Sequence, residues 1–442
     1  MSIEKIVSLC KRRGFVFQSS EIYGGYGAVY DYGPLGIELK NKISQLWWKS
    51  MTQLHDNIVG LDSGILMHPK IWKASGHVDA FNDPLVDCKQ CKARFRSDEL
   101  VNEETSATDW SSLQCPKCGT KGSLTEPRQF NLMFKTHIGP IENESNTAYL
   151  RPETAQGIYV NYLLTQNAMR LKIPFGIAQI GKAFRNEIVA RNFIFRTREF
   201  EQMEMQYFIK PENGDKSMEY WKNERCNFYS LIGIDSNKIR LTEHGPNELA
   251  HYAKEAWDIE YKFPFGWSEV EGIHNRTDFD LRMHQEHSGK KMEIFDQESN
   301  DRYLPYIIET SAGLNRMMLS VLSNAFWEDT DNNRIVMKLH PKIAPVTAVV
   351  CPLTKKDGLP EIGKTIIDIL KPNFKIIYDQ QGSIGKRYYR QDEAGTPFGI
   401  TVDHQSKEDD TVTIRDRDTQ TQERIEISNL LKVMKRKIED YT

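Results

Sequence analysis

The chain has 442 residues and a formal net charge of -3 at pH 7, with 39% hydrophobic and 27% charged residues. This length predicts two or three domains, and the apolar content excludes a chain that is disordered throughout. The net charge excludes a protein that coats nucleic acid with a uniformly basic surface, but it does not exclude local basic patches. No run of about 18 apolar residues occurs, so we expect no membrane span. The opening MSIEKIVSLCKRRGF lacks a secretory pattern, so we expect a protein of the reducing cytoplasm.

Residues 1–85 begin with a helical pattern and continue into a turn-rich stretch, SSEIYGGYGAVYDYGPLG. Its glycines lack the GK[ST] of a phosphate loop and the spacing of a dinucleotide fingerprint, so we interpret them as close backbone packing. Pro34 suits the first turn of a helix. That helix carries Ile43, Trp47 and Met51 at helical spacing, which predicts a core face or a subunit contact.

Four of the seven cysteines form two CxxC pairs, DCKQCK and QCPKCG, in a polar insertion at 86–128. In a reducing compartment such pairs are typical of a zinc site rather than of disulfides. Four thiolates leave no open coordination position, so a structural zinc ion is expected rather than a catalytic one. Free thiols in a degenerate knuckle are the alternative. The predicted ligands are Cys88, Cys91, Cys115 and Cys118.

The rest of the chain predicts a mixed unit followed by a second domain. DTDNNR and the two prolines of KLHPKIAPV mark the boundary, and beyond it strands alternate with helices, as in a small α/β domain. Basic residues there include Arg387, Arg415 and Arg417, for which a solvated surface is the ordinary interpretation. Before the boundary, strands are expected within 129–210, 266–283 and 303–311, and helices at 153–166, within 211–262 and from Gly313.

The most informative stretch is GKAFRNEIVARNFIFRTREFEQMEMQYFIK. Alternate residues of a strand share a face, so Phe200, Gln202 and Glu204 are expected together, as are Arg185 and Glu187. A polyphosphate needs fixed guanidinium groups, a purine needs an aromatic or arginine plane, and an ammonium group needs carboxylates. A salt-bridged, exposed sheet face is the alternative, but the presence of all three side-chain types favours a nucleotide site.

Two further stretches add to this chemistry. YLPYIIETSAGLNRMM places Glu309 and Ser311 on one face and leads into a helix with Arg316 in its first turn, where a phosphate is favoured. In GWSEVEGIHNRTDFDL, Glu269 and Glu271 are predicted to share a face. Such carboxylates suit Mg²⁺ bound together with a polyphosphate.

These motifs resemble a known family. FRNE with TREFEQMEMQYF, and ETSAGLNR before an apolar helix, are similar to the second and third signature motifs of class II aminoacyl-tRNA synthetases. YDYGPLG with its helix is similar to the first, which forms the dimer interface in that class. Together with ASGHVDAFNDP, RQFNLMF, YLRPETAQG and EFEQMEM, they resemble the dimeric glycyl-tRNA synthetases over nearly the whole chain. Mild departures from the family pattern are Thr310 and Asn315.

The resemblance implies an α+β fold, with an antiparallel class II sheet flanked by helices. The implied domains are a catalytic domain at 1–338, containing the cysteine-rich insertion at 86–128, and a C-terminal α/β anticodon-binding domain at 339–442. It also implies a homodimer that activates glycine with ATP and Mg²⁺ and transfers it to the 3′ end of tRNA(Gly). A class II synthetase for another small amino acid, a non-catalytic RNA-binding relative and a zinc-ribbon nucleic-acid binder are the alternatives.

The resemblance also implies roles for the residues that match the motifs of the family. Arg185 would hold the α-phosphate and the substrate carboxylate, and Phe200 would stack on adenine with Arg316 on its other side. The residues implied to be catalytic are Arg185, Glu187 and Arg316. Those implied to bind ATP are Arg185, Asn186, Glu187, Phe195, Arg196, Phe200, Glu269, Val270, Gly313 and Arg316. Those implied to bind glycine are Arg96, Glu153, Phe200, Gln202, Glu204, Glu309, Ser311 and Gly313.

Overall fold

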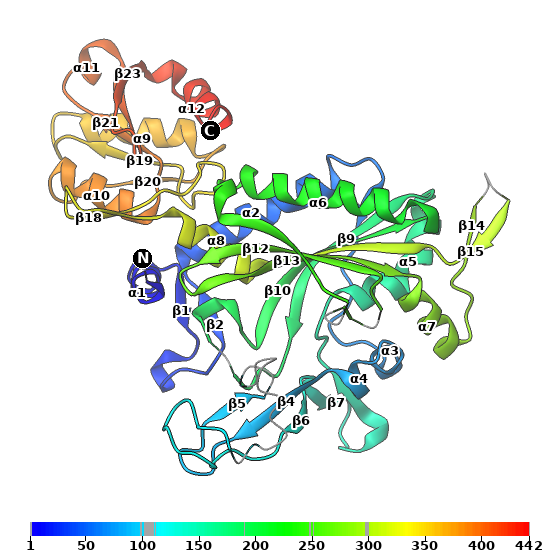
Figure 1. Ribbon diagram of the computed structural model, residues 1–442. Coiled ribbons are helices and arrows are strands. Elements are labelled where there is room, and N and C mark those ends of the chain that lie inside the picture. Colours follow the sequence, from blue (N-terminus) through cyan, green and yellow to red (C-terminus); the bar gives the residue numbers. More distant parts are fainter. Residues whose placement is uncertain are drawn as a thin grey trace.

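The structure is a computed structural model that describes residues 2–97, 100, 110, 112–189, 191–246, 249–250, 252–296 and 300–441. Most of the acidic stretch between the two cysteine pairs lies outside the described residues. No helix within these ranges is both long and apolar enough to cross a membrane. Figure 1 shows a large unit built on a twisted sheet, a smaller unit below it and a C-terminal unit at the upper left.

A seven-stranded sheet is the centre of the large unit, with the strand order β11-β12-β13-β16-β10-β9-β3. All neighbouring strands are antiparallel except β3 and β9, which are parallel. The strands are β3 (Ile58–Gly60), β9 (Phe175–Phe184), β10 (Glu199–Ile209), β11 (Ile239–Glu243), β12 (Glu255–Phe263), β13 (Gly266–Thr277) and β16 (Tyr306–Gly313).

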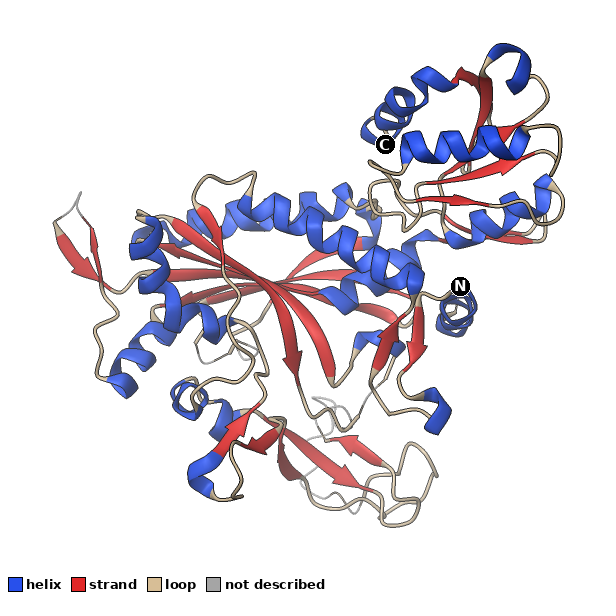
Figure 2. Cartoon of the chain, turned by 180° about the vertical axis from the view of Figure 1, so that it is seen from behind, coloured by secondary structure: helices blue, strands red, loops and turns tan. Residues whose placement is uncertain are grey.

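Two groups of helices cover the sheet. The first group shares the largest apolar core with one face of the sheet, and the second packs on part of the other face. Figure 2 shows long helices lying along the sheet from behind. The first group is α1 (Ile3–Arg13), α2 (Pro34–Thr52), α6 (Gly214–Leu231) and α8 (Leu314–Ala325), and the second is α5 (Ala155–Met169) and α7 (Phe279–Ser288).

Strand β10 shows why one face of the sheet is free for chemistry. Met203 and Met205 are fully buried in the apolar core with the first group of helices. Because side chains alternate along a strand, Gln202, Glu204 and Gln206 point to the other face. A row of polar side chains therefore crosses the middle of the sheet on the face away from α2, α6 and α8.

Strand β13 contains a β-bulge that separates two carboxylates. Ile259 pairs with Glu271 and Glu260 pairs with Glu269, so Val270 has no partner on β12. An extra residue reverses the alternation of side chains beyond it. The prediction that Glu269 and Glu271 share a face is therefore wrong, because a bulge cannot be read from period-2 alternation.

Glu271 instead joins the sheet to α6 inside the core. Its side chain is fully buried and accepts hydrogen bonds from Arg225 Nε at 2.5 Å and from the Tyr229 hydroxyl at 3.0 Å. Arg225 is equally buried. A buried charge needs a partner of opposite sign and further hydrogen bonds, and these three side chains satisfy that requirement away from the polar face.

The smaller unit below the sheet carries the cysteines. Its three-stranded sheet has the order β5-β4-β6, and two short helices join it to the large unit. These elements are β4 (Asn82–Asp87), β5 (Arg94–Arg96), β6 (Arg128–Asn131), α3 (Pro69–Ala74) and α4 (His77–Ala80). Two-stranded ribbons are β1 (Val16–Gln18) with β2 (Tyr30–Tyr32), β7 (Lys135–His137) with β8 (Thr147–Tyr149), β14 (Ile294–Asp296) with β15 (Asp301–Tyr303), and β17 (Phe326–Asp329) with β18 (Arg334–Met337).

The C-terminal unit has a five-stranded sheet of order β20-β19-β21-β22-β23 and an apolar core of its own. Arg387, Arg415 and Arg417 are buried and bonded within it, so they are not part of a solvated surface. Its elements are β19 (Ala348–Pro352), α9 (Leu359–Leu370), β20 (Ile376–Tyr378), α10 (Ile384–Ala394), β21 (Phe398–Val402), α11 (Ser406–Asp409), β22 (Thr411–Asp416), β23 (Gln422–Glu426) and α12 (Leu430–Glu439).

Three local predictions differ from the structure. The helix expected within 211–262 ends at Leu231, and strands β11 and β12 follow. The strand expected to reach residue 283 ends at Thr277, where α7 soon begins. DTDNNR is the turn of the β17–β18 hairpin rather than a linker, and the Asp329 carboxylate stabilises it by accepting hydrogen bonds from Asn332 and Arg334. In each case tertiary partners outweigh weak local preferences.

Arg225→Met is expected to lower the free energy of unfolding by about 3–5 kcal/mol, because it leaves the Glu271 carboxylate buried without a cation. The double variant Arg225→Met/Glu271→Leu is expected to be less destabilised, since it removes both charges. Urea unfolding followed by tryptophan fluorescence measures both values. A double variant that is no more stable than Arg225→Met would contradict this account of the pair.

Candidate active site

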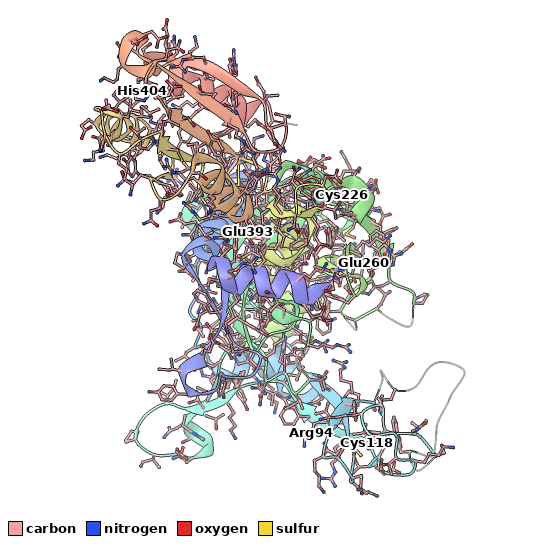
Figure 3. All side chains as sticks on the ribbon, turned by 90° about the vertical axis from the view of Figure 1, so that its left-hand side faces the viewer. Arg94, Cys118, Cys226, Glu260, Glu393 and His404 are labelled. Atoms are coloured by element: carbon pink, nitrogen blue, oxygen red, sulfur yellow. The ribbon has the colours of Figure 1, made fainter. Side chains whose placement is uncertain are left out.

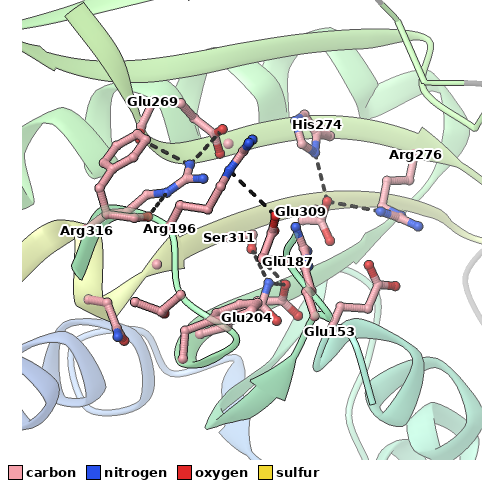
Figure 4. Close-up of a pocket in the computed structure, with 18 of the residues that line it drawn as sticks. Glu153, Glu187, Arg196, Glu204, Glu269, His274, Arg276, Glu309, Ser311 and Arg316 are labelled. Carbon is pink, nitrogen blue, oxygen red and sulfur yellow. Dashed lines mark hydrogen bonds and ion pairs between the residues drawn. The ribbon is translucent and has the colours of Figure 1, made fainter. Parts of the chain in front are cut away.

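A cavity opens on the polar face of the sheet, between β10, β13, β16 and the loop that follows β9 (Figure 4). It brings together most of the side chains that the sequence predicted, from stretches far apart in the chain. These are Glu153, Arg185, Glu187, Phe195, Arg196, Phe200, Gln202, Glu204, Glu269, Glu309, Ser311, Gly313 and Arg316. The lining also includes residues without a predicted role, namely Thr197, Tyr252, Gly272, His274, Arg276 and Asn315.

Glu204 of β10 lies at the floor of the cavity. Its carboxylate accepts hydrogen bonds from the Thr154 hydroxyl at 2.5 Å, the Gln202 amide at 2.9 Å and the Ser311 hydroxyl at 2.7 Å. All three donors are neutral, and Glu204 forms no ion pair within the part of the chain that the structure describes. Burial, together with two neighbouring carboxylates, raises the pKa of Glu204 to about 8.

Glu309 of β16 lies beside Glu204 but has cationic surroundings. One of its oxygens accepts a hydrogen bond from the Gln206 amide at 2.8 Å. The other lies 2.8 Å from His274 Nδ1 and 3.1 Å from Arg276 Nη1. Burial acts to raise the pKa of Glu309, but Arg276 and His274 outweigh it and hold the pKa at about 2. Glu309 is therefore ionised at neutral pH.

Glu153 is the third carboxylate, placed just before α5. His77 Nε2 of α4 lies 3.4 Å from one of its oxygens, and the Gln156 amide donates to the other at 3.0 Å. Burial acts to raise the pKa of Glu153, but the charges of His77 and Arg276 bring it below its ordinary value. Two of the three carboxylates thus have a basic side chain beside them, whereas Glu204 has only neutral donors.

Arg185 lies between two aromatic rings in the loop after β9. Its guanidinium carbon is 5.2 Å from the centre of the Phe200 ring and 5.3 Å from that of Phe81. Its Nε donates to the carbonyl oxygen of Pro152 at 3.1 Å. These contacts hold the cation close to the carboxylates, where it can bind an anion.

Arg316, in the first turn of α8, lies at the other end of the cavity (Figure 4). Its Nη1 donates to the Glu269 carboxylate at 2.9 Å, and its guanidinium lies over the Phe195 ring at 4.5 Å. Arg316 lowers the pKa of Glu269. The aromatic partner of Arg316 in this structure is therefore Phe195, whereas Phe200 is paired with Arg185.

Glu187 and Arg196 close the loop side of the cavity. Arg196 Nε lies 3.8 Å from a Glu187 oxygen. Burial raises the pKa of Glu187 despite the charges of Arg196 and Arg185.

Three predicted residues do not line the cavity. Val270, at the bulge, is buried in the apolar core. The backbone N–H of Asn186 donates to the carbonyl oxygen of Leu132 at 2.8 Å. Arg96 forms an ion pair with Asp83 at 2.7 Å, although its charge acts on Glu187.

His274 is isolated in the sequence, where packing or hydrogen bonding is the expected role, and Arg276 has no predicted role. The bulge places both on the cavity face together with Gly272, whereas regular alternation from Glu269 would place them on the opposite face. Gly272 is needed here, since a Cβ on it would lie 2.8 Å from the His274 ring. The imidazole therefore lies directly against the strand, which holds it next to Glu309.

The four predicted zinc ligands form a separate cluster. Their Sγ atoms all lie within 4.8 Å of one another, and the Cys88–Cys118 and Cys91–Cys115 separations are both 3.7 Å. Zinc–sulfur bonds of about 2.3 Å at tetrahedral angles place sulfur atoms about 3.8 Å apart, so the cluster fits this ion. Figure 3 shows Cys118 and Arg94 at the end of the molecule opposite His404 of the C-terminal unit.

Comparisons with known proteins agree with this fold. Residues 134–325 match the family model described as tRNA synthetase class II core domain (G, H, P, S and T), and residues 347–437 match the anticodon binding domain. A crystal structure of prolyl-tRNA synthetase from Cryptosporidium parvum, with halofuginone and AMPPNP, covers 98% of this chain with 75% of its own. Its TM-score of 0.67 at 13% identity shows a shared fold.

Curated relatives are much closer in sequence. A glycine–tRNA ligase of Treponema denticola is 60% identical, covering 100% of this chain and 98% of its own length. Those of Borrelia hermsii and Treponema pallidum are 54% and 52% identical over 99% of this chain. The chain therefore belongs to the glycine–tRNA ligases, within the class II aminoacyl-tRNA synthetases.

Proposed function

We propose that the cavity joins glycine and ATP to form glycyl-adenylate and pyrophosphate, and then passes the glycyl group to the 3′ end of tRNA(Gly). The observation that carries this proposal is the division of the cavity into two ends. Three carboxylates gather at one end, namely Glu153, Glu204 and Glu309. Arg316 lies with Phe195 at the other end, where Glu269 also borders the cavity. Glycine is a zwitterion without a side chain, and ATP is a polyanion with a flat base, so each end suits one substrate.

At the acidic end, the ammonium group of glycine binds next to Glu204 and supplies the positive charge that this carboxylate lacks. Glu153 and Glu309 already have basic side chains as partners, so Glu204 is the carboxylate left for the substrate. Arg185 is in place to bind the glycine carboxylate. Ser311, bonded to Glu204, narrows the space beside the substrate.

The cavity selects glycine without contacts to a side chain, because glycine has none. Affinity comes from the two charged ends of the substrate, and larger amino acids are excluded because their side chains would collide with the cavity wall. A site for a larger amino acid rejects a competitor that is one methylene smaller only weakly. Glycine has no smaller amino-acid competitor, so its site does not face this difficulty. A separate editing domain is therefore not required.

At the basic end, Phe200 and Arg316 lie on either side of the adenine, and Arg196 binds the outer phosphates. Glu187 binds the adenine amino group or orders the loop. Because Phe200 contacts Arg185 in the free protein, binding of ATP replaces this contact with stacking on the base. Three residues predicted to bind substrate lie outside the cavity, namely Asn186, Val270 and Arg96. We propose no direct contact with substrate for them, although the charge of Arg96 acts on Glu187.

Class II synthetases generally use ATP with Mg²⁺, and Glu269 fits that requirement. Its side chain is 47% exposed and borders the cavity, and Arg316 contacts only one of its oxygens. Mg²⁺ prefers carboxylate oxygen supplemented by phosphate oxygens and water. When bound, the ion neutralises phosphate charge, and Glu269 would hold it.

The reaction needs positioned charges rather than a covalent nucleophile. A glycine carboxylate oxygen forms a bond to the α-phosphorus of ATP while the bond to pyrophosphate breaks. A terminal ribose hydroxyl of tRNA then attacks the activated carbonyl, and AMP leaves. Arg185 contacts the α-phosphate in both steps, and Arg316 and Glu187 hold the nucleotide in line. Positioning and charge stabilisation supply most of the rate in such transfers.

Several features of organisation belong to the same proposal. The catalytic domain spans 1–338 and the anticodon-binding domain 339–442. The molecule works as a homodimer, which is consistent with exposed apolar side chains at Ile22 and Tyr23, 88% and 87% accessible. The seven cysteines, all among the described residues, form no disulfide, and we place the protein in the cytoplasm. A structural zinc ion is bound by the four-cysteine cluster.

ATP–pyrophosphate exchange tests the function directly. We expect exchange with glycine and none above background with alanine or serine, because Ser311 and the carboxylates leave no room for a Cβ substituent. A protein that exchanges equally with alanine would be a synthetase of different specificity. A folded protein without exchange for any amino acid would be a non-catalytic relative.

Glycine binding at pH 7 is expected to release about one proton. Glu204 is protonated below its pKa of about 8 in the free protein, and the glycine ammonium favours the ionised form. Affinity for glycine therefore increases as the pH rises toward 8 and then levels off. Calorimetry in two buffers of different ionisation enthalpy measures the proton count.

Glu204→Gln is the matched variant, since it keeps the shape of the side chain but has no proton to release. Its KM for glycine is expected to increase by about tenfold or more, with less than about a twofold change in the KM for ATP. Equal proton release by the variant and the wild type would remove Glu204 from this role.

Protein purified under reducing conditions without a chelator is expected to contain about one zinc ion per chain. Cys115→Ser removes one ligand and is expected to lower the zinc content sharply, as measured by elemental analysis. Cys226→Ser is the control, because Cys226 lies outside the cluster. Zinc-free wild-type protein would show that the thiols are not a metal site.

A further inference from the structure

A second layer of buried polar side chains lies directly behind the glycine end of the cavity. Arg276, at the end of β13, donates two hydrogen bonds to Asp280 of α7, from Nε at 2.8 Å and from Nη2 at 2.9 Å. It also donates to Glu309, from Nη1 at 3.1 Å, and its guanidinium carbon lies 3.8 Å from the centre of the Tyr252 ring. Arg276 and Asp280 are 3% and 2% exposed. The position of Arg276 beside Glu309 is thus fixed by Asp280 and the Tyr252 ring together.

Gln156, in the first turn of α5, connects this pair to the other flanking carboxylate. Its amide nitrogen donates to Glu153 at 3.0 Å and to Asp280 at 3.0 Å. Its amide oxygen lies 2.8 Å from His284 Nε2, one turn beyond Asp280 on α7. Gln156 is fully buried. Both amide hydrogens and the amide oxygen are therefore engaged, and this pattern suits glutamine but not glutamate or methionine.

The result is a continuous buried bridge between two cavity carboxylates on different elements. It runs from Glu153 through Gln156, Asp280 and Arg276 to Glu309. Ionised carboxylates that lie close together repel each other, and a mobile pair would turn apart or take up a proton. The bridge opposes this by holding each carboxylate with a donor that is itself held from behind.

We propose that Gln156 and Asp280 are positioning residues for glycine, which hold Glu153 and Glu309 in place next to Glu204, the carboxylate that receives the substrate ammonium. Neither residue lines the cavity, so each acts through another side chain. The inference rests on the proposed function, since it concerns how the same cavity binds glycine. Within the described residues, the hydrogen bonds and ion pairs of Arg316 go to Phe195 and Glu269 and not to the bridge, so we expect ATP binding to depend on the bridge much less than glycine binding does.

A purely structural role is the alternative, because the bridge also joins α5 to α7. The two roles differ in what a variant changes. Loss of packing lowers stability and affects both substrates alike, whereas loss of positioning affects the glycine end alone. A displacement of about 1 Å at a reacting group can cost on the order of 100-fold in rate, so even a small rotation of Glu153 or Glu309 is measurable.

The test is ATP–pyrophosphate exchange by full-length Gln156→Met, which has a similar length but no amide. We expect the KM for glycine to rise about tenfold or more, while the KM for ATP stays within about twofold and kcat at saturating glycine falls less than the KM rises. Asp280→Asn, which keeps the shape but not the charge, is expected to act in the same direction because it releases Arg276.

Arg225→Met is the matched control, since Arg225 forms an equally buried ion pair with the same strand, β13, on the opposite face of the sheet. It is expected to lower the melting temperature and to leave the ratio of the two KM values unchanged. The control and the two variants are compared at a temperature at which all are folded by circular dichroism.

The inference is overturned if Gln156→Met keeps the wild-type KM for glycine, or if the KM values for glycine and ATP rise together. Should Asp280→Asn fail to fold, Gln156→Met decides alone, because it removes no charge. Failure of the proposed function looks different: the wild-type protein itself would then show no glycine-dependent exchange.

Discussion

The crowding of three carboxylates, Glu153, Glu204 and Glu309, in one buried cavity is the constraint on which the rest of the site depends. Each would resist ionisation there, because burial and mutual repulsion both favour the neutral acid. Two of them have a basic side chain beside them, His77 at Glu153 and Arg276 at Glu309. The third is left with neutral donors, and its missing cation is the feature that an amino-acid ammonium can supply.

The bulge in β13 allows one strand to serve both stability and chemistry. Before it, Glu269 borders the cavity, and just after it Glu271 points into the core, where Arg225 neutralises it. In a regular strand without a bulge, Glu269 and Glu271 would lie on the same face. A further negative charge would then enter a cavity that already holds three, and α6 would lose its buried ion pair with the sheet.

The C-terminal unit is connected to the element that carries Arg316. Helix α8 has this arginine in its first turn and leads directly into the β17–β18 hairpin. Arg334 of that hairpin donates to Asp392 of α10 at 2.5 Å, and Asp392 also pairs with Arg415. The C-terminal unit therefore contacts the same continuous segment that carries Arg316 to the cavity.

The sequence by itself determined the residue types of the site and much of its geometry. The row from Phe200 to Glu204, the pairing of Glu309 with Ser311 and the two CxxC pairs follow from local period and spacing. Other features depended on tertiary structure: the side of β13 on which each residue lies, the basic side chains beside Glu153 and Glu309, and strands β11 and β12 in polar sequence. A bulge shifts alternation by one residue without any local signal, and partners such as His77 and Arg276 come from segments that only the folded chain brings together.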